Sequence, residues 1–271
     1  MKRKALFSLS LIVLILSSCG RDESGELIGV LDRPSWNGIN PYGMVYVPSG
    51  TLTIGQSDQD VFNTYIQRPK AISISGFFMD DTEITNNEYR QFVYWVRDSI
   101  AHLMMDDVYE DEYGNERIDW EYELDYRSEE LDDMFFQGDM KLNDFERAMD
   151  TRQLQYTYKW IDWQKAAHSP DVIRRDLLNE ETVNVYPDTL VWIRDFAYSY
   201  NEPFTRNYFW HPAFDDYPVV GVNWKQAKAF SHWRTELWNS FKGDSEPNTE
   251  EFRLPTETEW EWAARGGRDV A

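Results

Sequence analysis

The sequence predicts an α+β domain. Short β-rich stretches come first, at residues 44–55 and 70–75, and three helices with capping signals follow, beginning at Thr85, Asn223 and Thr256. Aromatic residues make up 16% of the 271-residue chain and include 12 tryptophans. Because disordered chains are poor in aromatic residues, this composition indicates a folded domain with a sizeable core.

The N-terminal residues have the layout of an export leader. Basic residues at positions 2–4 precede an apolar run over 5–16. That run is shorter than the about 20 apolar residues that cross a bilayer, so a simple transmembrane anchor is the weaker interpretation. Residues 16–19, Leu-Ser-Ser-Cys, resemble a bacterial lipobox. We therefore expect a signal peptide over 1–19 and a lipid on Cys19.

Cys19 is the only cysteine of the chain. A chance cysteine near an ordinary cleavage site is the alternative to lipidation. Once lipidated, Cys19 would leave no thiol for a disulfide, a metal site or a nucleophile. Residues 20–43, with several glycines and prolines, are expected to form a tether between the lipid and a domain over 44–271.

The first part of that domain has a strand pattern. Residues 44–47 are β-rich, Pro48-Ser49-Gly50 is a turn, and a second strand follows over 51–54 with Leu52 and Ile54 on one face. Residues 70–75 alternate again, which predicts that Ile72 and Ile74 point inward.

The three predicted helices share one kind of start. At each of them a capping residue is followed three positions later by Glu or Gln: Thr85 and Glu88, Asn223 and Gln226, Thr256 and Glu259. Apolar side chains recur at helical spacing behind each start. The third helix runs into Gly266-Gly267, a typical C-terminal stop.

The middle of the chain, about residues 98–215, is strongly acidic. It holds 28 acidic and 11 basic residues, a net charge of −17 out of −21 for the whole chain. The whole-chain charge argues against nucleic acid and anionic lipid as partners. We interpret the segment as a structured, partner-binding insertion with helical stretches such as 142–163; a loosely ordered loop is the alternative.

Four stretches, taken in order, resemble the sulfatase-modifying-factor family, whose fold is that of formylglycine-generating enzymes. They are residues 44–55, 78–92, 218–233 and 253–266. The resemblance implies an irregular fold of the C-type-lectin-like kind. The active enzymes of the family use a pair of cysteines that binds copper. Related domains also bind calcium, so the resemblance leaves room for a structural calcium ion.

The leader narrows the resemblance to the GldK (PorK) group of gliding-motility lipoproteins of the Bacteroidota type IX secretion system. This implies a lipid anchor in the outer membrane, facing the periplasm. It also implies a large ring built with a GldN (PorN)-type partner and other components of the secretion machinery. The expected function is therefore a non-catalytic structural ring component.

No catalytic, cofactor or metal site is expected in this chain. The cysteine pair is absent, and the four histidines, His102, His168, His211 and His232, show no local ligand spacing. Two acidic clusters resemble metal sites but fit better as negative charge at helix N-termini: Asp80, Asp81 and Glu83 just before the cap at Thr85, and Glu257, Glu259 and Glu261 at the helix that begins at Thr256. The alternatives left open are a periplasmic formylglycine-generating-type modifying enzyme and a carbohydrate-binding lipoprotein that uses exposed Trp and Tyr.

Domains of this family continue beyond the fourth stretch. We therefore expect the domain to be incomplete at its C-terminal end, with apolar surface uncovered around Trp260 and Trp262.

Overall fold

The computed structural model describes residues 41–55, 69–112, 114, 116–141, 147–169, 171–195, 198, 207–242 and 250–268. The expected signal peptide, Cys19 and residues 20–40 of the tether lie outside these ranges, so what the sequence predicts for them stays a prediction. Within the described ranges, no helix combines the length and the apolar character needed to cross a bilayer.

Four short strands begin the described chain. They are β1 (Met44–Val47), β2 (Gly50–Ile54), β3 (Lys70–Ile74) and β4 (Phe77–Asp80). β1 pairs antiparallel with β4, and β2 pairs antiparallel with β3. The predicted strands are confirmed, but β1 and β2 pair with later strands and not with each other. β4 was not predicted, because Phe77-Phe78-Met79 is a continuous apolar run without alternation.

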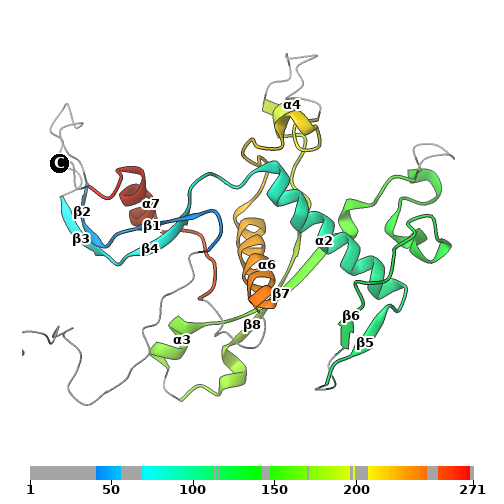
Figure 1. Cartoon of the computed structure of the whole chain (residues 1–271), viewed down its shortest axis with the longest axis horizontal. Helices are drawn as coiled ribbons and strands as arrows, with labels where there is room; N and C mark the ends of the chain where they lie inside the picture. Colours follow the sequence, from blue (N-terminus) through cyan, green and yellow to red (C-terminus); the bar gives the residue numbers. More distant parts are fainter. Residues whose placement is uncertain are drawn as a thin grey trace, which may run out of the picture. The chain divides into compact units, whose positions relative to one another are not determined.

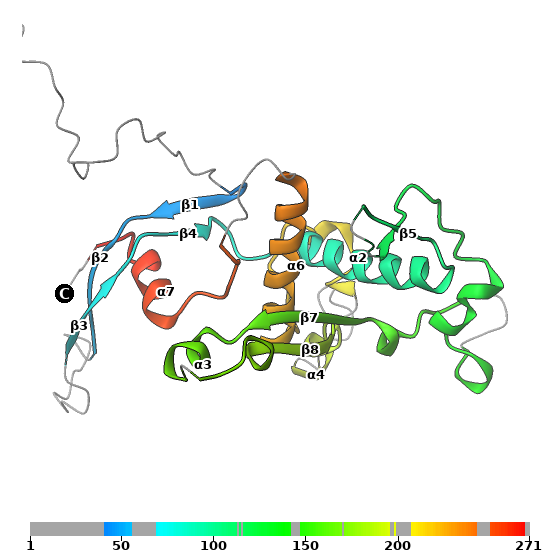
Figure 2. The ribbon, with the colours of Figure 1, turned by 90° about the horizontal axis from the view of Figure 1, so that it is seen from below.

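These strands pack against the last described helix, α7 (Glu257–Ala264) (Figure 2). Leu52 and Ile74 are buried there with Trp262, which is 4% exposed. Ile54 and Ile72 pack against the same cluster, as their spacing predicts. The expectation of uncovered apolar surface is wrong for Trp262 and holds for Trp260, which is 60% exposed.

The two long helices are α2 (Asn86–Met104) and α6 (Trp224–Lys242). All three predicted capping boxes are present. In each, the side chain of the capping residue accepts a hydrogen bond from the backbone N–H three residues later, and the Glu or Gln side chain at that later position accepts one from the backbone N–H of the capping residue. Gly266 and Gly267 follow α7 with φ of +66° and +67°, the left-handed region that ends helices. The predicted helix starts and the stop are confirmed.

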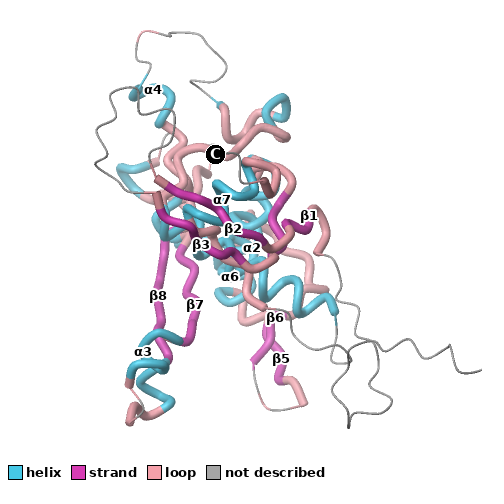
Figure 3. Tube along the Cα trace, turned by 90° about the vertical axis from the view of Figure 1, so that its left-hand side faces the viewer, coloured by secondary structure: helices cyan, strands magenta, loops and turns pink. Residues whose placement is uncertain are grey.

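The described residues of the acidic segment are structured. They form two antiparallel hairpins, β5 (Val108–Glu110) with β6 (Glu116–Ile118) and β7 (Gln155–Ile161) with β8 (Leu178–Asn184). Three 3₁₀ turns lie between the two hairpins, the short helix α3 (Trp163–His168) lies between β7 and β8, and a second short helix, α4 (Val191–Asp195), follows β8. Figure 3 shows β7 and β8 as a long ribbon with α3 at one end.

The predicted helical stretch over 142–163 is wrong where the structure describes it. Residues 142–146 lie outside the described ranges, and in the remainder a 3₁₀ turn over Thr151–Gln153 is followed by the strand β7. Tyr156 and Tyr158 are 6% and 2% exposed, whereas Gln155, Thr157 and Lys159 are exposed. Buried and exposed side chains alternate with a period of two, which is the pattern of a strand and not of a helix.

The main core joins the acidic segment to the two long helices (Figure 1). α2 contributes Tyr89 and Phe92, and α6 contributes Phe230 and Trp233. The β7–β8 ribbon and the chain on either side of it add six further buried side chains: Leu154, Tyr156, Tyr158, Val183, Val185 and Phe209. Residues of the segment interpreted as an insertion therefore complete the core between α2 and α6.

Candidate functional site

The four stretches that carry the family resemblance meet in pairs, and the first pair joins β2 to α7. The Trp262 indole N–H donates to the backbone oxygen of Pro48 at 2.9 Å. Its ring covers Gly50 so closely that a Cβ at Gly50 would lie 2.2 Å from Trp262 Cζ2. A glycine at position 50 is thus required by the close approach of the indole ring.

The second and third stretches meet at the start of α2. Thr85 and Pro218 form an antiparallel bridge, and Asn86 N–H donates to the Tyr217 carbonyl at 2.9 Å. Asp80, at the end of β4 just before this joint, forms a bidentate ion pair. Arg234 on α6 donates to both carboxylate oxygens of Asp80, at 2.7 and 2.8 Å. The contact links β4 to α6 across 154 residues of chain.

This ion pair accounts for one member of the first acidic cluster. Asp80 is half-buried against Arg234, whereas Asp81 and Glu83 are exposed. The Asp81 backbone N–H donates to the Gly43 carbonyl and holds the chain at the start of β1. The three carboxylates lie in different surroundings, as a structural interpretation requires.

The second acidic cluster is also used structurally. Glu259 closes the α7 capping box and accepts two bonds from Arg253 at 2.6 and 2.8 Å. Hydrogen bonding from Arg253 and from the Thr256 backbone lowers the pKa of Glu259 to about 2. Glu261 pairs with Arg265 one turn on, and Glu257 is exposed in the first turn of α7, where a negative charge favours the helix N-terminus.

The four histidines have four separate environments. His102 is buried 3.4 Å from Asp107, and His232 stacks on Tyr158 at 4.5 Å. His168 bonds the Gln164 carbonyl, and His211 accepts from the Ala213 backbone. Burial lowers the pKa of His232. In the part of the chain that the structure describes, no three His, Cys, Asp or Glu residues are grouped so as to hold a metal ion.

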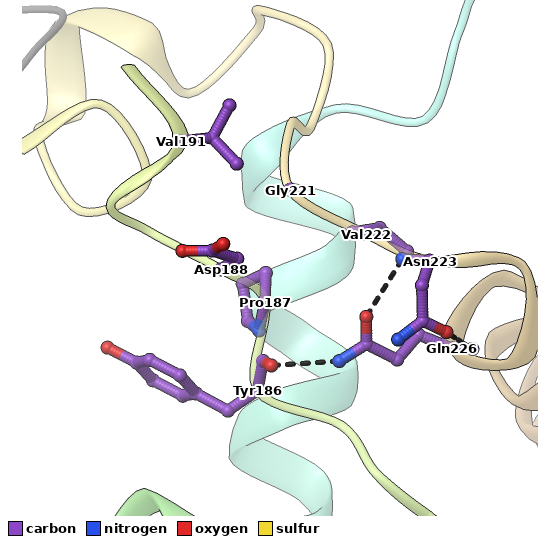
Figure 4. A pocket seen from close by; sticks show the side chains of 8 residues that line it. All are labelled: Tyr186, Pro187, Asp188, Val191, Gly221, Val222, Asn223 and Gln226. Atoms are coloured by element: carbon purple, nitrogen blue, oxygen red, sulfur yellow. Dashed lines mark hydrogen bonds between the residues drawn. The ribbon is translucent and has the colours of Figure 1, made fainter. Parts of the chain in front are cut away.

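A surface pocket of about 440 Å³ lies where the chain after β8 meets the start of α6 (Figure 4). Sequence reasoning did not find it. It is lined by Tyr186, Pro187, Asp188, Val191, Gly221, Val222, Asn223 and Gln226. The one feature of the sequence that could have pointed to the pocket is Gly221, a glycine within the third stretch, residues 218–233. Gly221 has φ +82°, and a Cβ there would lie 2.2 Å from the Asp188 carbonyl oxygen.

The polar groups of this pocket bond to the protein itself. The Gln226 amide donates to the Asn184 and Tyr186 carbonyls at 3.0 and 2.8 Å and accepts from Asn223 N–H at 2.9 Å. Asp188 pairs with Arg194, which is the main cause of the lowered pKa of its carboxyl group. The pocket thus fastens the chain after β8 to the α6 cap, and its chemistry is that of a structural joint.

Comparison with known proteins agrees with the motif pattern. Residues 35–271 match the family model of the sulfatase-modifying factor enzyme 1-like domain. The formylglycine-generating enzyme of Bos taurus is 22% identical over 227 residues, which is 84% of this chain and 40% of that protein. The Bos taurus protein named inactive C-alpha-formylglycine-generating enzyme 2 is 42% identical over 52 residues, 19% of this chain and 12% of that protein.

The chain therefore spans well under half the length of these curated relatives. The family match, in contrast, extends from before the first strand to the end of the chain. Together with the four stretches and their joints, it shows that the chain belongs to the sulfatase-modifying factor family.

Proposed function

We propose that this protein is a non-catalytic outer-membrane lipoprotein, held by a lipid on Cys19 and facing the periplasm. In this proposal it is a structural ring component of the type IX secretion and gliding-motility machinery, as in the GldK (PorK) group. Its main partner is a GldN (PorN)-type ring protein. The acidic segment over about 98–215 is an insertion in a C-type-lectin-like domain that starts at residue 44.

The observation that supports a scaffold most strongly is the use of the family stretches as joints. Trp262 binds Pro48, Thr85 pairs with Pro218, and Asp80 is held by Arg234. A catalytic acid or base must reach a substrate atom with its own hydrogen-bonding capacity. In these stretches the carboxylates of Asp80 and Glu259 instead stabilise the contacts between elements.

The cysteine content supports the same proposal. The enzymes of the family use a cysteine pair, and this chain has one cysteine, which the lipobox resemblance assigns to the lipid. One of the two Bos taurus relatives is named as an enzyme and the other as inactive, so the relatives include proteins of both descriptions. The similarity to the formylglycine-generating enzyme supports the alternative function, a periplasmic formylglycine-generating-type modifying enzyme.

Co-purification from membranes tests the proposal. The full chain and a tagged GldN (PorN)-type partner are produced together, solubilised in mild detergent and separated by size. We expect a large complex that contains both proteins and is lost from the membrane fraction when Cys19→Ala removes the lipid site. Recovery of the membrane-bound chain without the ring partner would contradict the proposed assembly.

A second experiment addresses the enzymatic alternative. The purified full chain is incubated with a cysteine-containing sulfatase peptide and copper, and the peptide mass is followed over time. We expect no conversion of cysteine to formylglycine. Conversion at a rate proportional to protein concentration would establish the enzyme and reject the non-catalytic proposal.

A further inference from the structure

Exposed apolar side chains lie at the end of α2 and on the part of the acidic segment that follows it. Leu103 is 58% exposed, Tyr109 55%, Trp120 49% and Tyr122 52%. Backbone bonds hold their segments together, since Asp107 N–H donates to the His102 carbonyl and Asp119 N–H donates to the Asp107 carbonyl. We call these four side chains and the carboxylates between them the acidic–aromatic surface.

Trp120 is held in place on this surface. Its ring stacks on Trp95 with centroids 5.9 Å apart and meets the edge of the buried His102 ring at 5.3 Å. Next to His102 in the chain, Ala101 of α2 is buried in a small core with Leu131, Met134 and Phe135. A half-exposed indole that is already ordered loses little conformational entropy on binding, which is the property of an interface anchor.

The charge around these side chains has one sign. Residues 103–140 contain 15 acidic and two basic residues, a net charge of −13. One of the two basic residues, Arg117, pairs with Asp111. Glu110, Glu116, Glu121 and Glu123 are exposed beside Tyr109, Trp120 and Tyr122. A surface of this kind repels nucleic acid and anionic lipid and attracts a positively charged protein.

We propose that the acidic–aromatic surface docks a basic segment of a partner protein. Arginine and lysine side chains of the segment meet the carboxylates, and a guanidinium or an apolar side chain covers Trp120 and Tyr122. A cation over an indole face is attracted by the negative face of the ring, which adds to the charge attraction. The inference rests on the proposed function in one respect, namely that a scaffold needs a protein partner.

Binding of a defined probe tests the surface. The full lipoprotein in detergent is titrated with a fluorescent peptide of alternating arginine and leucine, and a glutamate–leucine peptide serves as the control probe. We expect binding of the basic peptide alone, weakened at least about tenfold when salt rises from 50 to 500 mM, because exposed charges are then screened. Equal binding of both peptides would overturn the proposal.

Matched variants locate the site. We expect binding of the basic peptide to weaken about tenfold or more in two surface variants, Trp120→Ala and the double variant Glu121→Lys with Glu123→Lys. The controls are Trp163→Ala, an exposed tryptophan on α3, and the pair Asp216→Lys with Glu250→Lys, which makes the same charge change on exposed residues elsewhere. Far-UV circular dichroism checks that each variant is folded. If the control variants weaken binding as much as the surface variants, the proposed location is wrong.

The same variants separate this inference from the proposed function. Loss of the ring partner in the surface variants, with retention in the controls, supports both. Surface variants that bind the basic peptide as tightly as the controls do overturn the docking surface, and assembly with the ring partner in those variants leaves the ring function standing. Peptide binding that needs Trp120, in a protein that never assembles with the ring partner, supports the surface and contradicts the ring function.

Discussion

Adding a single methyl group at Gly50 tests the joint between β2 and α7. The new Cβ of Gly50→Ala would lie 2.2 Å from Trp262 Cζ2 and 2.6 Å from Cη2, whereas ordinary contact begins at 3.4 Å. The ring is buried and held by its bond to Pro48, so it moves only by breaking that bond.

The expected magnitude follows from two opposing effects. Overpacking a filled core costs about 1–3 kcal/mol. Replacing glycine by alanine reduces the entropy of the unfolded chain and returns about 0.4–1 kcal/mol. We therefore expect Gly50→Ala to lower the free energy of unfolding by roughly 1–2 kcal/mol.

Gly76→Ala is the matched control. Its Cβ would lie 2.3 Å from the Tyr46 hydroxyl, but that side chain is 60% exposed and can rotate into solvent. The entropy gain is the same and moving the Tyr46 side chain costs little, so Gly76→Ala should leave the free energy of unfolding unchanged or raise it by up to about 1 kcal/mol. In a Trp262→Phe background, the shorter ring leaves room for the methyl group, and the cost of Gly50→Ala should largely disappear.

Urea unfolding of the full chain in detergent measures these differences, with tryptophan fluorescence and far-UV circular dichroism as independent probes. The reasoning is refuted if Gly50→Ala and Gly76→Ala agree within about 0.5 kcal/mol, or if the cost of Gly50→Ala is the same with Phe at position 262.

Three further predictions follow from single contacts. The folded pKa of Glu259 is depressed from 4.5 to about 2, so its contribution to stability is present above pH 4.5 and lost as the pH falls through about 2; Glu259→Gln should therefore destabilise the chain at pH 7, with a difference that shrinks in urea melts at lower pH. Gln226→Leu strands the Asn184 and Tyr186 carbonyls and should cost about 1–3 kcal/mol, whereas exposed Lys225→Leu should cost under about 1 kcal/mol in the same melts. Tyr89→Phe removes the 2.9 Å bond from α2 to the Val185 carbonyl and should cost about 1 kcal/mol, and unchanged stability would show that this buried contact does not hold the acidic segment to α2.

Local chemistry explains which elements were predictable. A capping box acts over three residues, so Thr85 with Glu88 and Asn223 with Gln226 could be identified from the sequence before any tertiary contact was known. The same holds for Gly266 and Gly267 at the end of α7. These predictions succeeded because the residues that make each feature are close together in the chain.

Strand pairing was not predictable in the same way. Residues 44–54 suggested a strand, a turn and a strand, and each strand instead pairs with a partner from residues 70–80. The alternation in β7 was present in Tyr156 and Tyr158 but was mistaken for part of a helix. Pairing depends on which edge becomes available in the folded chain, and the hydrophobic pattern alone leaves that choice open.

The sequence by itself determined the family, the three helix starts and the absence of a second cysteine, because each of these is a property of neighbouring or countable residues. Only the tertiary structure decided what the acidic residues do. Asp80 is an ion-pair partner because Arg234, 154 residues later, reaches it from α6. Trp120 is held in place because α2 brings the rings of Trp95 and His102 against it. A side chain's role depends on the charge and packing of its neighbours in space, and folding brings those neighbours from distant parts of the chain.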